Sequence, residues 1–227
     1  MFPKVNPKVN NMRKQLDLTL YLVLDPVMCG GIAGLVETTK IAVANGVTTV
    51  QLRSEQPFDR KDWYNAALAL KEVLSTTPVP LLINDQVDVA MAVQADGVHV
   101  GQSDLPVEVV RQLIGTEKIV GLSVSNQAQM QAVPWSQIDY LGIGPIFPTT
   151  SKGDAAPVLG VQQLQQLVCT KHRPAVAIGG INGGNIESVL HTGVEGVAVI
   201  SAICGQPDVG QATQQLLRKI SHARAGN

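Results

Sequence analysis

Cysteine is scarce in this chain of 227 residues, and its few thiols are poorly spaced for cross-linking. The three cysteines are Cys29, Cys169 and Cys204; their number is odd, and no two of them have CxxC spacing. Small secreted domains are commonly stabilised by disulfide bonds between paired cysteines, whereas thiols in the cytosol are kept reduced. The sequence therefore favours free thiols and a cytoplasmic protein.

Long hydrophobic runs and a strong charge bias are also missing. The first 17 residues are polar and basic, without the apolar stretch of a secretory signal, and no later apolar run could span a membrane. The formal net charge is −1, so a broad basic surface for nucleic acid is not indicated. We expect a protein that acts on small molecules without nucleic acid or membrane, as a monomer or a homo-oligomer.

Hydrophobic residues make up 45% of the chain and form short runs that alternate with longer amphipathic segments. The runs expected to be strands are Thr19–Leu24, Thr48–Leu52, Pro80–Ile83, Gly97–Val100, Ile119–Val124, Tyr140–Ile143, Ala175–Ile178 and Gly196–Ile200. The segments expected to be helices are Gly34–Asn45, Asp59–Ser75, Val87–Gln94, Val107–Leu113, Gln127–Val133, Val161–Lys171, Asn185–His191 and Val209–Ser221. This alternation predicts a parallel sheet with right-handed crossovers.

Eight such repeats in about 200–250 residues are typical of a (β/α)₈ barrel, or TIM barrel. An open doubly wound sheet is the alternative. However, Asp25–Gly31 follows the first predicted strand, where such sheets often have a G-x-G-x-x-G turn. We therefore expect a single TIM-barrel domain at residues 18–222, an N-terminal extension at 1–17 and a tail at 223–227.

Two acidic residues each follow a predicted strand. Asp85 comes after Leu81–Asn84, and Asp104 comes after Val98–Ser103, one strand–helix unit later. Active sites of barrels form at the carboxyl ends of the strands, so both carboxylates should lie on one rim and could share a Mg²⁺ ion. The alternative is that each caps the helix that follows it. For the pair beside Asn84, the metal site is the preferred interpretation.

Groups suited to phosphate follow later strands. Gly180 and its glycine neighbour come after the seventh strand and Ser201 after the eighth, where barrels commonly bind phosphate; an ordinary tight turn is the alternative. Hydroxyls and a cation gather in Thr149–Lys152, which is either a phosphate-binding loop or a solvated one. Arg53 ends the second strand and needs an anion, from a substrate or from nearby Glu55.

These strand-end residues together resemble the thiamine-phosphate synthase family, also called thiamine-phosphate pyrophosphorylase. The resemblance covers roughly residues 20–203. The motifs that carry it are Leu-Tyr-Leu-Val at 20–23, Gln-Leu-Arg at 51–53, Leu-Ile-Asn-Asp at 82–85, Ala95–Asp104, Gly-Pro-Ile-Phe-Pro-Thr at 144–149 and Ala-Ile-Gly-Gly-Ile-Asn at 177–182.

The resemblance implies a transferase that joins 4-amino-2-methyl-5-(diphosphooxymethyl)pyrimidine to a thiazole phosphate, giving thiamine phosphate and diphosphate. It implies a dissociative substitution assisted by Mg²⁺, with Asp85 and Asp104 as the metal ligands. The residues implied for the pyrimidine diphosphate are Gln51, Arg53, Asn84, Ser123 and Lys152, with Arg53, Ser123 and Lys152 in catalytic roles. Those implied for the thiazole phosphate are Thr149, Thr150, Ser151, Gly180, Ile200 and Ser201.

One residue departs from the family pattern. The family usually has Gln-Leu-Arg-x-Lys after the second strand, whereas this chain has Glu55 at the lysine position. An anion there opposes diphosphate binding and keeps two alternatives open: a thiazole tautomerase on the same barrel, and a non-catalytic thiamine-phosphate-binding protein. The retained Asn84, Asp85, Asp104 and Lys152 favour the synthase.

Overall fold

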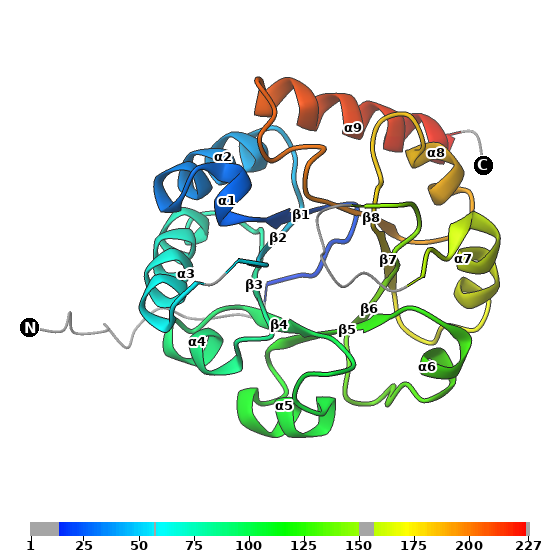
Figure 1. Cartoon of the computed structure of the whole chain (residues 1–227), viewed down its shortest axis with the longest axis horizontal. Coiled ribbons are helices and arrows are strands. Elements are labelled where there is room, and N and C mark those ends of the chain that lie inside the picture. The colour runs from blue at the N-terminus through cyan, green and yellow to red at the C-terminus, as the bar shows by residue number, and fades with distance from the viewer. Residues whose placement is uncertain (1–13, 57, 150–156, 226–227) are drawn as a thin grey trace, which may run out of the picture.

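Eight parallel strands close into a barrel in the computed structural model of the chain, which describes residues 14–56, 58–149 and 157–225. Each strand pairs with the next in sequence, and β1 pairs with β8 to close the ring (Figure 1). The strands are β1 (Leu20–Leu24), β2 (Thr49–Leu52), β3 (Leu81–Asn84), β4 (Gly97–Val100), β5 (Ile119–Val124), β6 (Tyr140–Ile143), β7 (Ala175–Ile178) and β8 (Gly196–Val199). The predicted (β/α)₈ barrel is confirmed, and the open-sheet alternative was wrong.

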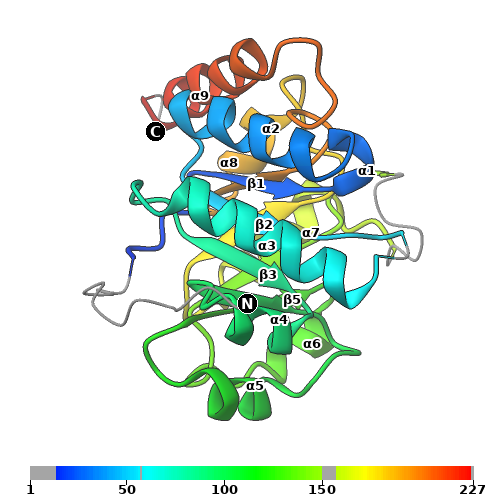
Figure 2. The same ribbon diagram turned by 90° about the vertical axis from the view of Figure 1, so that its left-hand side faces the viewer.

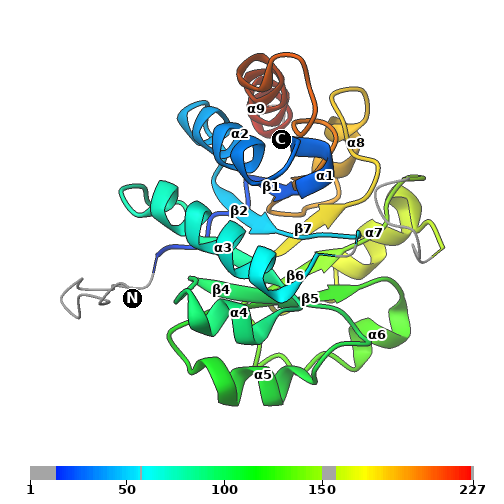
Figure 3. The ribbon, with the colours of Figure 1, turned by 60° about the vertical axis from the view of Figure 1, so that its left-hand side comes forward.

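Helices follow the strands in chain order and cover the outside of the ring, as α3 covers β2 and β3 in Figure 2. They are α1 (Pro26–Cys29), α2 (Ile32–Ala44), α3 (Arg60–Leu74), α4 (Val87–Ala92), α5 (Val107–Ile114), α6 (Gln127–Gln131), α7 (Gly160–Val168), α8 (Ile186–Leu190) and α9 (Val209–Ala225). The last helix lies beside α2 and so completes the outer layer where the chain ends (Figure 3).

The short helix α1 was not expected from the sequence. Asp25 caps it, because its carboxylate accepts hydrogen bonds from the backbone N–H groups of Val27 and Met28 at 2.8 and 3.0 Å. Pro26 stands at its first position, where a missing N–H costs nothing. Helix α1 therefore begins directly at the carboxyl end of β1.

The strands are apolar along both faces because each face packs against a different layer. In β1, Leu20, Leu22 and Leu24 point outward into the core between strands and helices, while Tyr21 and Val23 belong to the core inside the barrel. Alternation with a period of two sends successive side chains to opposite faces of a strand. Burial on both faces explains why the strands read as continuous hydrophobic runs.

Both expected boundaries of the barrel domain lie within ordered structure. Lys14 is part of the expected extension, yet its ammonium group donates hydrogen bonds to the carbonyl oxygens of Leu74 and Val79 at 2.8 and 2.9 Å. At the other end, α9 continues to Ala225 with Ala223 buried, so the tail predicted from residue 223 was wrong there. The alanine packs against the core, and that contact carries the helix beyond Ser221, where the sequence pattern ends.

The described helices include none that is both long and apolar enough to cross a membrane. Cys29, Cys169 and Cys204 are all free thiols, as the sequence predicted.

Candidate active site

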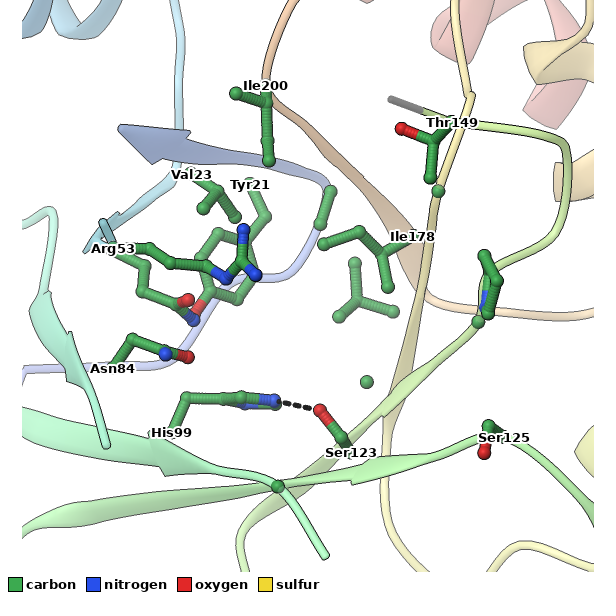
Figure 4. A pocket seen from close by; sticks show the side chains of 18 of the residues that line it. Tyr21, Val23, Arg53, Asn84, His99, Ser123, Ser125, Thr149, Ile178 and Ile200 are labelled. Atoms are coloured by element: carbon green, nitrogen blue, oxygen red, sulfur yellow. Dashed lines mark hydrogen bonds between the residues drawn. The ribbon is translucent and has the colours of Figure 1, made fainter. Parts of the chain in front are cut away.

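A cavity of about 460 Å³ opens at the carboxyl ends of the barrel strands. Every strand contributes to its wall, either directly or through the first residues of the loop that follows (Figure 4). A wider groove of about 1170 Å³ lies at the opposite, amino end and is lined by residues such as Lys14, Glu195 and Arg224. Those predicted site residues that the structure describes line the first cavity, at the end of the barrel where enzymes of this fold place their chemistry.

The predicted residues converge on this cavity from strands far apart in sequence. Those that line it are Gln51, Arg53, Asn84, Asp85, Asp104, Ser123, Thr149, Gly180, Ile200 and Ser201. Thr150, Ser151 and Lys152 lie outside the described residues. The described members of the predicted set therefore form one site.

The two aspartates do not cap the helices that follow them. The N-cap of α4 is Gln86, and the N-cap of α5 is Pro106. Asp104 instead turns back, and its Oδ2 accepts a hydrogen bond from the backbone N–H of Gly101 at 2.8 Å. The helix-cap alternative considered from the sequence was therefore wrong for both residues.

Asp85 has an unusual backbone that directs it toward the cavity. Its φ angle is 58°, in the left-handed region that aspartate and asparagine tolerate better than most residues. Its backbone N–H donates to the carbonyl of His99 at 2.9 Å, which joins the end of β3 to β4. Asn84 Nδ2 donates to Asp85 Oδ2 at 2.6 Å and orients the carboxylate.

The donor set fits a hard divalent cation. Both carboxylates belong to loops after adjacent strands, β3 and β4, and both line the cavity. Mg²⁺ is commonly held by one or two protein carboxylates and completes its coordination with water and substrate phosphate. Within the described ranges, no group of three or more His, Cys, Asp or Glu side chains could hold a metal. Two carboxylates leave coordination positions open for water and phosphate, so Asp85 and Asp104 could hold an ion that a diphosphate helps to bind.

Arg53 extends into the cavity (Figure 4). It forms an ion pair with Glu55. Its side chain is only 13% exposed, and that of Glu55 is 29% exposed, so water screens the pair less than it would at the surface. The sequence-based expectation that Glu55 could supply the anion for Arg53 is confirmed. An incoming phosphate would compete with Glu55 for the guanidinium group.

A chain of hydrogen bonds crosses the floor of the cavity. Gln51 Nε2 donates to the Tyr21 hydroxyl at 2.6 Å, and that hydroxyl lies 2.8 Å from the Tyr140 hydroxyl. The Tyr140 hydroxyl lies 2.8 Å from His99 Nδ1, and His99 Nε2 lies 2.8 Å from Ser123 Oγ. Burial raises the pKa values of both tyrosines well above their usual value, so the phenols stay protonated.

Sequence reasoning found the two ends of this chain but missed Tyr21 and Tyr140. Both ring nitrogens of His99, which lies within β4, have protein partners. The sequence shows a polar aromatic residue within an apolar run at Tyr21, His99 and Tyr140. It does not show that these three side chains are in contact.

The glycines after β7 bring the backbone close to the loop after β6. Gly180 has a φ angle of +64°, and a Cβ there would lie 2.6 Å from the carbonyl oxygen of Pro148. Backbone hydrogen bonds from Ile146 N to Ile178 O and from Phe147 N to Gly179 O, both 3.0 Å long, hold the two loops together. Only glycine fits this position, so the turn is more constrained than an ordinary tight turn.

Comparison with known proteins agrees with this geometry. Residues 20–203 match the family model described as thiamine monophosphate synthase. The chain is 49% identical to the thiamine-phosphate synthase of Laribacter hongkongensis over 93% of its own length and 99% of that protein. It is 44% identical to a thiamine-phosphate synthase of Desulfitobacterium hafniense over 89% of this chain and 97% of that one.

A solved structure is similar along nearly the whole chain. The thiamine phosphate pyrophosphorylase from Pyrococcus furiosus superimposes with a TM-score of 0.80 and 35% identity, covering 94% of this chain and 99% of that one. With the family model and the relatives taken together, the chain belongs to the thiamine-phosphate synthase family and is a transferase.

Proposed function

We propose that the protein joins 4-amino-2-methyl-5-(diphosphooxymethyl)pyrimidine to a thiazole phosphate and releases diphosphate. The observation that best supports this proposal is that all the site residues predicted from the sequence and described by the structure line one cavity. That cavity has carboxylates and Arg53 on the side of β2 to β4, and a glycine turn with Ser201 on the side of β7 and β8. Two anionic ends of two substrates can therefore be bound at separate places.

The diphosphate end of the pyrimidine substrate is assigned to Arg53, Asn84 and Lys152. A guanidinium group suits phosphate oxygens because it offers several donors in a fixed plane. Bound Mg²⁺, held by Asp85 and Asp104, would neutralise charge that develops on the diphosphate as it leaves.

The pyrimidine ring is assigned to Gln51 and Ser123, and the thiazole phosphate to the hydroxyls and backbone around the glycine turn. The residues assigned to that phosphate are Thr149, Thr150, Ser151, Gly180, Ile200 and Ser201. Gly180 lets the backbone approach a phosphate closely, and Ser201 adds a hydroxyl donor. This arrangement supports placing the two substrates side by side above the buried floor.

The reaction breaks one bond and forms another at the same carbon atom. The bond between the pyrimidine methylene and the bridging diphosphate oxygen breaks first, and the oxygen keeps the electron pair. The lone pair of the thiazole nitrogen then forms the new bond to that methylene. The nitrogen carries no proton, so the site needs no general base. His99 and Glu55, which already have partners in Tyr140, Ser123 and Arg53, agree with that requirement.

The tautomerase alternative depends on an acid or base at the thiazole. Glu55 was the residue that kept this alternative open, and its ion pair with Arg53 favours a charge-balancing role instead. We further propose Mg²⁺ as the cofactor and the cytoplasm as the location. The free thiols agree with a reducing compartment.

One assay tests the proposed function. Purified protein is incubated with both substrates and Mg²⁺, and thiamine phosphate and diphosphate are measured together. We expect thiamine phosphate and diphosphate in equal amounts with Mg²⁺, and neither product without it. Interconversion of thiazole phosphate isomers without metal, with no thiamine phosphate formed, would instead identify a tautomerase.

A further inference from the structure

The hydrogen-bond chain under the cavity joins two residues that face the ligand from different sides of the barrel. Gln51 stands on β2 and Ser123 on β5, and both line the cavity. Between them Tyr21, Tyr140 and His99 are buried, with exposed fractions of 1%, 0% and 8%. Figure 4 shows the imidazole of His99 directed at the hydroxyl of Ser123. The hydrogen-bond chain therefore connects two ligand-facing groups through buried side chains.

The barrel leaves room for this hydrogen-bond chain at two glycines, Gly121 on β5 and Gly142 on β6. A Cβ at Gly121 would lie 2.4 Å from His99 Nδ1 and 2.2 Å from Cζ of Tyr140. A Cβ at Gly142 would lie 3.0 Å from Cε1 of His99. Real Cβ atoms essentially never approach other atoms as closely as at Gly121, and a Cβ at Gly142 would make His99 shift by a few tenths of an ångström, so a larger residue at either position would displace a ring. Glycines on β5 and β6 thus accommodate both rings of the chain.

The donors and acceptors along the chain are linked in one direction. Gln51 Nε2 donates to the Tyr21 oxygen, and the arrangement that then gives every group a partner has Tyr21 donating to Tyr140. In that arrangement Tyr140 donates to His99 Nδ1, and a neutral His99 with its proton on Nε2 donates to Ser123 Oγ. The Ser123 hydroxyl proton is thereby directed away from His99 and is offered to a ligand.

The donor and acceptor roles of Gln51 and Ser123, at the two ends of the hydrogen-bond chain, therefore cannot change independently. With Nε2 of Gln51 committed to Tyr21, its Oε1 is left to accept, while Ser123 donates. If the Gln51 amide turned over, every link would reverse, and Ser123 would become an acceptor. A reversal requires protons to shift at all the links together, which a pair of independent polar side chains would not require.

We infer that Tyr21, Tyr140 and His99 are positioning residues that make the cavity select a 4-aminopyrimidine over the corresponding 4-oxopyrimidine. This inference rests on the proposed function, because it concerns the ring of the pyrimidine diphosphate. A 4-aminopyrimidine has an amino donor beside a ring-nitrogen acceptor, and its 4-oxo counterpart has a carbonyl acceptor beside a ring N–H donor. In the direction given by Gln51, the amino group donates to Oε1 and a ring nitrogen accepts from Ser123. The oxo ring presents the opposite pattern at both ends.

The test compares two ligands across three single substitutions and the double variant Tyr21→Phe/Tyr140→Phe. The ligands are 4-amino-2-methyl-5-(diphosphooxymethyl)pyrimidine and its 4-oxo analogue, and their dissociation constants are measured by calorimetry with Mg²⁺. The substitutions are Tyr140→Phe, Tyr21→Phe and the control Tyr64→Phe on the outer helix α3, where the side chain is 38% exposed. Each removes one hydroxyl and nothing else.

We expect the unsubstituted protein to bind the amino ligand about 100-fold more tightly than the oxo ligand, because mispaired buried groups are costly. Tyr140→Phe should reduce this ratio by roughly tenfold, since it releases both ends of the chain from each other. Tyr21→Phe should reduce the ratio by a similar factor, and the double variant should reduce it little further. Tyr64→Phe should leave the ratio unchanged.

Other results would overturn the inference. A ratio near one in the unsubstituted protein would mean that the chain selects nothing, even if thiamine phosphate is formed. An equal loss of affinity for both ligands in Tyr140→Phe would identify a purely structural role. Should Tyr140→Phe unfold, Tyr21→Phe decides the question at the other end of the same hydrogen bond. If neither pyrimidine binds and no thiamine phosphate forms, the proposed function itself fails.

Discussion

Replacing Glu55 by glutamine should strengthen the binding of the pyrimidine diphosphate. The carboxylate of Glu55 lines the cavity and is paired with Arg53, so it opposes a diphosphate in two ways. It repels the ligand directly, and it occupies the cation that the ligand needs. Glu55→Gln keeps the size of the side chain and removes only the charge.

The magnitude follows from the position of the charge. A unit charge about 6 Å from a phosphate contributes about 3 kcal/mol at an effective dielectric constant of about 20. The Glu55 side chain is 29% exposed, and partial screening by water reduces this to about 1–2 kcal/mol. That range corresponds to a dissociation constant that is roughly 5- to 30-fold lower.

The assay is titration calorimetry with the pyrimidine diphosphate at two ionic strengths. The gain should shrink at high salt, because the repulsion that is removed is electrostatic. Glu117→Gln is the matched control, since this exposed glutamate stands on the turn before β5 and is not part of the cavity wall. An affinity that is unchanged or weaker in Glu55→Gln would refute the reasoning and would mean that Arg53 and Glu55 bind the ligand as a pair.

Three further substitutions test other parts of the site and the barrel. Asp104→Asn should raise the Mg²⁺ concentration needed for half-maximal rate by about 10- to 100-fold, as measured by metal titration; an unchanged requirement would remove Asp104 from the metal site. Gly180→Ala should raise the KM for thiazole phosphate at least roughly tenfold, because its Cβ would meet the carbonyl of Pro148 at 2.6 Å. Gly115→Ala is its control, since Gly115 also has a positive φ angle (+79°) but nothing lies within 4 Å of its added Cβ. Leu82→Ala, in the fully buried barrel interior, should lower the free energy of unfolding in urea by about 2–5 kcal/mol.

The strands were predictable because a strand that is buried on both faces is a short, continuous hydrophobic run in the sequence. Each strand was expected within one residue of its observed ends, and the differences occur where an apolar run does not coincide with the hydrogen-bond ladder. Asn84, for example, continues the ladder of β3 after the apolar run has ended. The end of α9 was missed for the opposite reason, since Ala223 is buried by tertiary packing that no local pattern reveals.

The rim of the site was predictable, and its floor was not. Residues at strand ends converge in any closed parallel barrel, so their position along the chain already places them together. The Tyr21 and Tyr140 hydroxyls meet across a separation of 119 residues, and Tyr140 and His99 across 41. Which interior side chains share a layer depends on the stagger between strands when the ring closes, and the apolar pattern does not encode it. Glu55 was visible in the sequence, but its partner became certain only with the ion pair to Arg53.

The anchoring of Lys14 gives the amino end of the barrel a built-in reporter of local opening. Its ammonium group donates to the carbonyl of Leu74, the last residue of α3, and to that of Val79 just before β3. Trypsin must draw a lysine side chain into its own acidic pocket before it can cleave, and Lys14 is not available while both bonds persist. Cleavage after Lys14 should therefore require the end of α3 to separate from this segment. Its rate in native buffer would measure how often that corner of the barrel opens without unfolding the whole chain.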